Sequence, residues 1–177
     1  MGVPGLYGQW LQNEIKQAVV NGLPPYVASL AFDLNGVFHE ARKIVYGEGF
    51  KHPKLQEALL RTDPLQLELE LFNAITKILL TMIQAVNPID CIIFAVDGVA
   101  PGAKMQQQRG RRERAAKERH PGEIFDRNAI TPGTEFMMRL DTFMIRFITT
   151  YREYLPPKVI YDNHLRPREG EIGRAHV

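Results

Sequence analysis

Three short apolar runs, each ending at or close to a carboxylate, constrain the fold of this chain more than any other feature. The runs are YVASLAFD, which ends at Asp33, CIIFAVD, which ends at Asp97, and KVIYD, which is followed closely by Glu169 and Glu171. Near-continuous runs of β-branched and other apolar residues are typical of strands buried on both faces of a parallel sheet. We therefore predict three parallel strands whose last residues meet at one edge of a sheet.

The segments between these runs have the pattern of helices. Apolar residues recur at helical spacing over Leu65–Val86, although the opening LQLELEL alternates as a strand would. Residues 134–154 form a second helical segment, and Thr131 followed by Pro132 fits a cap and a first-turn proline. The segment from Tyr46 to Pro64 is predicted to be a loop. Strands that alternate with helices predict an α/β fold.

The cysteine content bears on the compartment. Cys91 is the only cysteine in the 177 residues, so an intrachain disulfide is excluded and a reducing, intracellular environment, cytoplasmic or nuclear, is expected. No uninterrupted apolar run approaches the roughly 20 residues that cross a bilayer. We therefore expect neither a disulfide partner nor a membrane partner.

The last six residues, Ile172 to Val177, have an unusual sequence. They read IGRAHV, which is the translation of the start of a widely used sequencing adapter. Our hypothesis is that they are a read-through artefact and that residues 1–171 are a cut-off part of a longer natural protein. The underlying DNA either carries the adapter string or does not, which tests the hypothesis directly.

The strand ends carry the first chemical signal. In an open α/β sheet, ligands bind beyond the carboxyl ends of the strands, which would gather Asp33, Asp97, Glu169 and Glu171. Clustered carboxylates repel one another unless a cation lies among them, and an all-oxygen set suits Mg²⁺ or Mn²⁺. Taken singly, either aspartate is more often a helix cap or a turn residue, and the glutamates are ordinary solvated charges.

The second signal is a basic helix that follows Asp97. The stretch from Lys104 to Arg119 holds seven Lys or Arg residues against two Glu, and Pro101 is well placed to begin a helix. Four polar or basic residues, at positions four, seven and eight after the first, fall on one face: Lys104, Gln108, Arg111 and Arg112. Such a face near a helix N-terminus suits a phosphate. The alternative is an exposed basic helix without a specific ligand.

Several motifs together resemble the 5′→3′ exoribonuclease (XRN) family. MGVPGLYGQW resembles its MGVP start, and FDLNGVFH resembles its LDxNxxxH element. VDGVAPGAKMQQQRGRR is close to IDGVAPxAKMxQQRxRR, FDRNAITPGTEFM to FDxNxITPGTxFM, and RPREGE to VPGEGEHK. These motifs span positions 1 to 171 in the family's order.

The resemblance implies a fold and an activity. It implies a three-layer, Rossmann-like nuclease core of the PIN and flap-endonuclease type, with a mainly parallel sheet that is incomplete at the C-terminus. It also implies an Mg²⁺- or Mn²⁺-dependent enzyme that degrades RNA with a 5′-monophosphate to mononucleotides. Because further acidic ligands of the family lie beyond this stretch, we expect the chain by itself to be weakly active or inactive.

The resemblance assigns roles residue by residue. It places Asp33, Asp97, Glu169 and Glu171 on the metal-binding, catalytic positions. It places four residues in the 5′-phosphate pocket: Lys104, Gln108, Arg111 and Arg112. His39 falls on a histidine that packs against the terminal nucleotide, although a lone histidine on a helix is more often structural. Asn35 is a candidate for ordering the metal site.

One departure and two alternatives remain. Arg168 stands where the family has Gly in PGEGE, which puts the shape of the acidic loop in doubt. The first alternative is a flap-type 5′ nuclease acting on DNA, which the FDRNAITPGTEF element disfavours. The second is a catalytically dead domain that binds RNA 5′ ends, which the four retained acidic residues disfavour.

Overall fold

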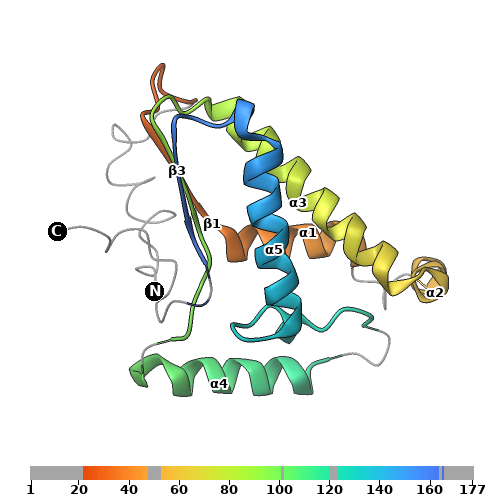
Figure 1. Cartoon of the computed structure of the whole chain (residues 1–177). Coiled ribbons are helices and arrows are strands. Elements are labelled where there is room, and N and C mark those ends of the chain that lie inside the picture. Colours follow the sequence, from red (N-terminus) through yellow and green to blue (C-terminus); the bar gives the residue numbers. More distant parts are fainter. Residues whose placement is uncertain (1–21, 48–52, 101, 120–122, 164, 166–177) are drawn as a thin grey trace.

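The protein is an α/β structure built on a three-stranded parallel sheet, and mostly helical outside it (Figure 1). The computed structural model describes residues 22–47, 53–100, 102–119, 123–163 and 165. Its elements, in chain order, are β1 (Ser29–Asp33), α1 (Leu34–Tyr46), α2 (Pro53–Arg61), α3 (Pro64–Val86), β2 (Cys91–Ala95), α4 (Gly102–Lys117), η4 (Arg127–Ala129), α5 (Glu135–Thr150), η5 (Arg152–Tyr154) and β3 (Lys158–Asp162).

The sheet confirms the three predicted strands and their direction, although β2 ends at Ala95, two residues before Asp97. Its order is β1-β2-β3, and both pairs of neighbours are parallel. Asp33 pairs with Ala95, and Ala95 pairs with Asp162, so all three strands end level with one another. The carboxyl ends therefore form one edge, and α4 lies beyond that edge (Figure 1).

One face of the sheet packs against α1, α3 and α5 in a single core. Phe32, Ile92 and Phe94 are buried there, and the rings of Phe32 and Phe94 stack at 5.5 Å between centroids. The helices bury matching apolar stripes, which include Leu34, Phe38, Leu140 and Met144. These described elements make two layers, and the third layer of the expected core stays a prediction.

Helix α3 resolves the ambiguity of the LQLELEL segment. Its fully buried residues recur every fourth position: Leu67, Leu71, Ile75, Leu79 and Ile83. A helix places these five residues on one face. In a strand, every second residue faces inward, so the residues midway between them would be buried as well. Helix α3 is also long and apolar enough to span a membrane by length and composition, but its buried stripe belongs to the protein core.

The predicted loop between Tyr46 and Pro64 is partly wrong, because it contains α2. Helix α2 buries Leu59 in the core and carries an ion pair of 2.6 Å between Arg61 and Glu57, one turn apart. The neighbouring Gly, His and Pro residues masked this short amphipathic segment in the sequence. A nine-residue helix gains little stability by itself, so the packing of Leu59 decides its formation.

The predicted cap of α5 is also wrong by three residues. Thr134, not Thr131, is the N-cap, and its hydroxyl accepts a hydrogen bond of 3.3 Å from Met137 N. Thr131 belongs to the preceding turn, where its carbonyl accepts from Thr134 N at 3.3 Å. Gly133 adopts a φ of 87° in that turn, a conformation that glycine reaches without strain.

Candidate functional site

A short hydrogen-bond network holds two of the predicted acidic residues together at the carboxyl edge of the sheet. Asp33 ends β1, and its Oδ1 accepts from Asn35 N at 3.1 Å. The side-chain Oδ1 of Asn35 then accepts from Asp97 N, again at 3.1 Å, across 62 residues of sequence. The first turn of α1 thus links the end of β1 to the loop that follows β2.

Asp33 fits both roles considered from the sequence, as the cap of a helix and as a carboxylate available to a metal ion. It is the N-cap of α1, with extended backbone angles that suit this position. The cap occupies Oδ1, while the side chain is exposed at the edge of the sheet. The capping role is therefore confirmed, and it fixes the position of a carboxylate that still has a second oxygen to offer.

Sequence reasoning passed over one acidic residue at this edge. Asp162 ends β3, and its carbonyl accepts from Val96 N at 2.9 Å beside Asp97. The signal was present, because the run KVIYD ends in a carboxylate just as the first two runs do. Attention to Glu169 and Glu171 obscured it. Those two glutamates and Arg168 lie outside the described residues.

His39 lies on α1, more than one turn after Asp33, with part of its side chain exposed and part packed against the protein. Partial burial within the protein lowers the pKa of its imidazole, and the positive charges of Arg42, Lys43 and Arg127 lower it further. Asp33 opposes this effect. A lowered pKa keeps the ring neutral at pH 7, which suits stacking on a base.

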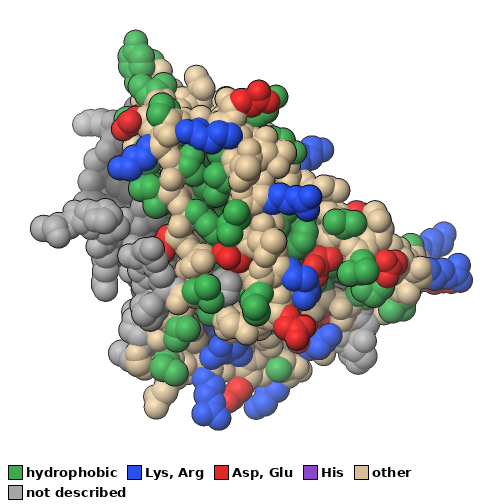
Figure 2. Space-filling model, in the orientation of Figure 1, with side chains coloured by type: hydrophobic (Ala, Val, Ile, Leu, Met, Phe, Trp, Pro, Cys, Tyr) green, Lys and Arg blue, Asp and Glu red, His purple; other side chains and the backbone are tan. Residues whose placement is uncertain are grey.

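Helix α4 confirms the predicted basic helix and shows which side faces the protein. Lys104, Gln108 and Ala115 are half-buried, whereas Arg111 and Arg112 are exposed. At 100° per residue, Lys104, Gln108 and Ala115 lie within an arc of about 40°. Arg111 and Arg112 lie on either side of this arc, so the structure keeps the four predicted phosphate-binding residues on one side of α4. Figure 2 shows Lys and Arg side chains gathered over α4 at the bottom of the molecule.

Two other arginines, one on α4 and one just after it, have partners within the protein. Arg109 pairs with Glu113 at 3.0 Å on the outer face of the helix. Arg119 pairs with Asp126 at 3.3 Å and also donates to the carbonyl of Glu123 at 3.4 Å. These pairs separate Arg109 and Arg119 from the four residues of the inner side.

The described residues do not contain a complete metal site. Among residues 22–47, 53–100, 102–119 and 123–163, no three His, Cys, Asp or Glu residues are grouped closely enough to hold an ion. Asp33, Asp97 and Asp162 meet at one edge without forming such a group. The predicted set of metal ligands stays a prediction, because two of its four members, Glu169 and Glu171, lie outside the described residues.

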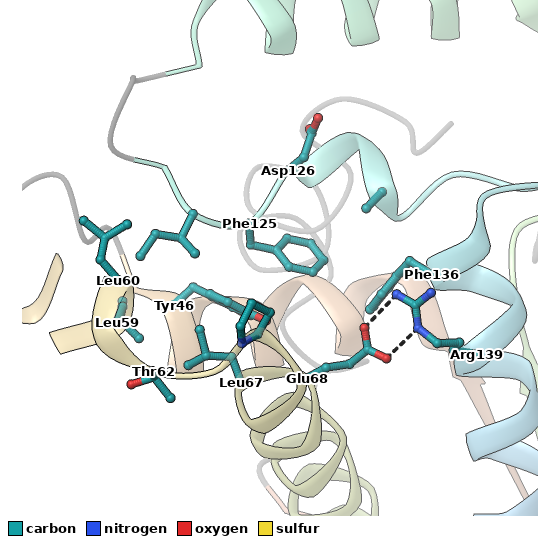
Figure 3. A pocket seen from close by; sticks show the side chains of 13 residues that line it. Tyr46, Leu59, Leu60, Thr62, Leu67, Glu68, Phe125, Asp126, Phe136 and Arg139 are labelled. Atoms are coloured by element: carbon teal, nitrogen blue, oxygen red, sulfur yellow. Dashed lines mark hydrogen bonds and ion pairs between the residues drawn. The ribbon is translucent and has the colours of Figure 1, made fainter. Parts of the chain in front are cut away.

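A pocket of about 380 Å³ lies away from this edge (Figure 3). Its walls are mainly apolar and aromatic, with Tyr46, Phe125 and Phe136 among them, and it contains no predicted site residue. At its rim, Arg139 donates two hydrogen bonds to Glu68, at 2.6 and 2.8 Å. Arg139 and Glu68 are paired with each other, and Asp126 in the lining pairs with Arg119 at 3.3 Å. We regard the pocket as an apolar crevice beside α2, α3 and α5.

Comparison with known proteins decides the family. A family model described as the N-terminus of XRN 5′-3′ exonucleases matches residues 1–173. This chain belongs to the XRN family. The resemblance carried by the five motifs, including those in the N-terminal residues outside the described structure, is thereby confirmed.

Curated XRN relatives match almost the whole chain. The 5′-3′ exoribonuclease 1 of Homo sapiens is 33% identical over 97% of this chain, and that of Schizosaccharomyces pombe is 31% identical over 97%. The 5′-3′ exoribonuclease 2 of Candida albicans is also 31% identical over 97%. The chain spans only 10%, 13% and 21% of these three proteins, so it corresponds to a small part of each.

Proposed function

We propose that the protein containing this chain is a divalent-metal-dependent 5′→3′ exoribonuclease that degrades 5′-monophosphorylated RNA to mononucleotides inside the cell. The observation that carries the proposal is the network of Asp33, Asn35 and Asp97 at the carboxyl edge of a parallel sheet. Membership of the XRN family and the names of the curated relatives support the reaction class. The preference for a 5′-monophosphate rests on the residues of α4.

The donor set at the sheet edge fits Mg²⁺ or Mn²⁺. Asp33 and Asp97 offer only oxygen ligands, and the capping bond of Asp33 leaves its Oδ2 in place for a cation. Together with Glu169 and Glu171, they would hold the ion. A bound metal supplies a water of lowered pKa and stabilises the leaving oxygen of a phosphodiester. The protein's contribution is to position these residues: the capping bond fixes the carboxylate of Asp33, and the Asn35 bridge fixes the backbone of Asp97.

The basic helix would select and position the substrate. Lys104 and Gln108 are half-buried on the side of α4 that faces the protein, where a terminal phosphate could be enclosed. Arg111 and Arg112 add guanidinium groups that suit phosphate oxygens. A compact donor cluster accepts a monophosphate and excludes a bulkier cap or triphosphate. Fixing the terminal phosphate also fixes which phosphodiester reaches Asp33 and Asp97, so mononucleotides are released.

The deciding experiment uses the full-length enzyme that contains this segment. Degradation of 5′-monophosphorylated and 5′-triphosphorylated RNA is compared with Mg²⁺, in the parent and in Asp97→Asn. We expect loss of the monophosphorylated RNA from its 5′ end, survival of the triphosphorylated RNA, and an inactive variant. Asp90→Asn is the matched control, because Asp90 is exposed at the opposite end of β2.

Other results would favour the two alternatives. Cleavage of branched DNA with RNA left intact would support a flap-type nuclease. Tight binding of RNA 5′ ends without degradation would support a non-catalytic domain. Equal attack on both RNAs would overturn the phosphate-binding role of α4 and leave the exoribonuclease assignment standing.

A further inference from the structure

A cluster of two guanidiniums and one carboxylate lies between α1 and η4. The Oε1 of Glu123 is 3.7 Å from Nη1 of Arg42 and 3.1 Å from Nε of Arg127. The side chains of Arg42 and Glu123 are only 10% and 11% exposed, whereas that of Arg127 is 40% exposed. Arg127 therefore shares its carboxylate with a second guanidinium and is the member of the cluster that reaches solvent.

The cluster adjoins the predicted substrate site. Arg42 lies three residues after His39 on α1, and the charges of both Arg42 and Arg127 act on the His39 imidazole. Arg127 begins η4, which packs against α4, the helix of the predicted phosphate pocket. Arg127 thus lies between two elements that are expected to contact the first nucleotide of the RNA.

The terminal nitrogens of Arg127 are used differently from those of Arg139 and Arg152. Arg139 uses Nε and Nη2 on Glu68, and Arg152 uses Nη1 and Nη2 on three backbone carbonyls. Arg127 meets Glu123 through Nε, and its two Nη groups form no hydrogen bond with any residue in the described part of the chain. Glu123 thus holds the Nε side of the Arg127 guanidinium, and the two Nη groups face solvent, where they can donate to a ligand.

We propose that Arg127 binds a backbone phosphate of the RNA next to the nucleotide that His39 contacts. This inference rests on the proposed function, because it takes RNA as the ligand. A half-exposed guanidinium with free Nη donors matches the two oxygens of a phosphodiester. Its partial ion pair with Glu123 fixes the side chain in advance, which reduces the entropy lost when RNA binds.

The test measures RNA binding by the full-length enzyme in an Asp97→Asn background, which is expected to hold the substrate without cutting it. The probe is a short, fluorescently labelled, 5′-phosphorylated oligoribonucleotide, and its Kd is measured by anisotropy over a series of KCl concentrations. Arg127→Gln should raise Kd about tenfold and reduce the slope of log Kd against log salt by about 0.7, the value for one phosphate contact with a single strand.

Two further variants separate phosphate binding from a scaffold role. Arg127→Lys retains the charge and should keep the salt slope of the parent. Arg146→Gln removes an exposed arginine of α5 and should change neither Kd nor slope. An unchanged Kd and slope in Arg127→Gln would overturn the proposal. The proposal would also be overturned if Arg127→Gln and Arg127→Lys weakened RNA binding equally, lowered Tm and kept the salt slope of the parent. That result would identify Arg127 as a purely structural residue.

The failure of the proposed function has a different signature. A parent enzyme with its Asp97 intact that leaves 5′-monophosphorylated RNA undegraded would overturn the exoribonuclease assignment, whatever the behaviour of Arg127. In an enzyme that does degrade this RNA, the Arg127 variants alone decide the further inference.

Discussion

The acidic edge of the sheet and the basic helix α4 are held in place in different ways. The edge is fixed by strand register and by two hydrogen bonds of Asn35, which donates to Asp33 and accepts from Asp97, and it borders a core of fully buried side chains. Helix α4 is exposed over most of its surface, and only Lys104, Gln108 and Ala115 of its described side chains are half-buried. The chain thus places an edge with a firmly held backbone near a helix whose exposed charged groups can adjust to a ligand.

This contrast suggests different roles for the two regions, catalysis at the sheet edge and substrate recognition on α4. Catalysis needs groups held within fractions of an ångström, which a sheet edge provides. Recognition of a phosphate by several long side chains tolerates more adjustment, because each donor contributes independently of the others. Substitutions at the edge should therefore lower kcat, and substitutions on α4 should raise KM.

The largest effect is expected at Asp97. Asp97→Asn in the full-length enzyme should lower kcat by about a thousandfold, equivalent to about 4 kcal/mol, because it removes a negative charge from the edge proposed to bind the metal. The KM for 5′-monophosphorylated RNA should change little. Single-turnover and steady-state kinetics measure both constants, with Asp90→Asn as the control. A large rise in KM with kcat retained would contradict the catalytic role of the edge.

A smaller and different effect is expected at Lys104. Lys104→Gln should raise KM about tenfold for 5′-monophosphorylated RNA and reduce the preference for it over 5′-hydroxyl RNA, since a charged donor to the phosphate is lost. Lys117→Gln, on the outer side of the same helix, is the matched control. Competition between the two RNAs gives the preference. A loss of kcat without a change in preference would show that α4 is not the phosphate site.

Removing the Asn35 bridge tests how strongly catalysis depends on the rigidity of the sheet edge. Asn35→Ala leaves Asp97 N without its partner, at a cost of about 1 kcal/mol in the free energy of unfolding. It should also lower kcat about tenfold, because the loop after β2 is no longer tied to α1. Denaturant unfolding and kinetics measure the two effects, and Asn73→Ala on the exposed side of α3 is the control. Unchanged kcat with lowered stability would mean that the bridge serves folding alone.

His39 gives the smallest expected effect, a change in pH dependence. Its pKa is lowered in the folded protein, so the unfolded chain binds the proton more readily and stability falls as the pH drops below about 6.5. In His39→Gln, the free energy of unfolding should therefore fall less steeply than in the parent as the pH drops from 7 toward the folded-state pKa of His39. Urea unfolding at a series of pH values checks this. A steeper decline in the variant would contradict the lowered pKa.

Part of the fold followed from local patterns in the sequence. The runs that end at Asp33 and Asp97 and the run KVIYD gave three strands, because a buried parallel strand requires a continuous apolar segment whatever surrounds it. The level ends of these strands then followed from parallel pairing. The basic helix was predictable too, since its spacing depends on helix geometry and its polar face needs no tertiary partner.

Other features depended on contacts that no local pattern contains. The LQLELEL segment has a strand-like alternation, and the core opposite Leu67 and Leu71 selected the helix. Helix α2 forms because Leu59 finds a buried place, and the cap of α5 moved to Thr134 because a turn through Gly133 places its hydroxyl below Met137 N. Tertiary packing outweighed weak local preferences in each case.

The candidate site divides in the same way. The sequence by itself determined which residue types stand at the strand ends and on α4, because these positions follow from the periods of strands and helices. Only the tertiary structure decided that Asn35 joins Asp33 to Asp97, that Asp162 ends level with Asp33, and that the charge of Arg127 acts on His39. Hydrogen bonds and charges between residues far apart in the chain depend on how the elements pack, and no sequence period records that.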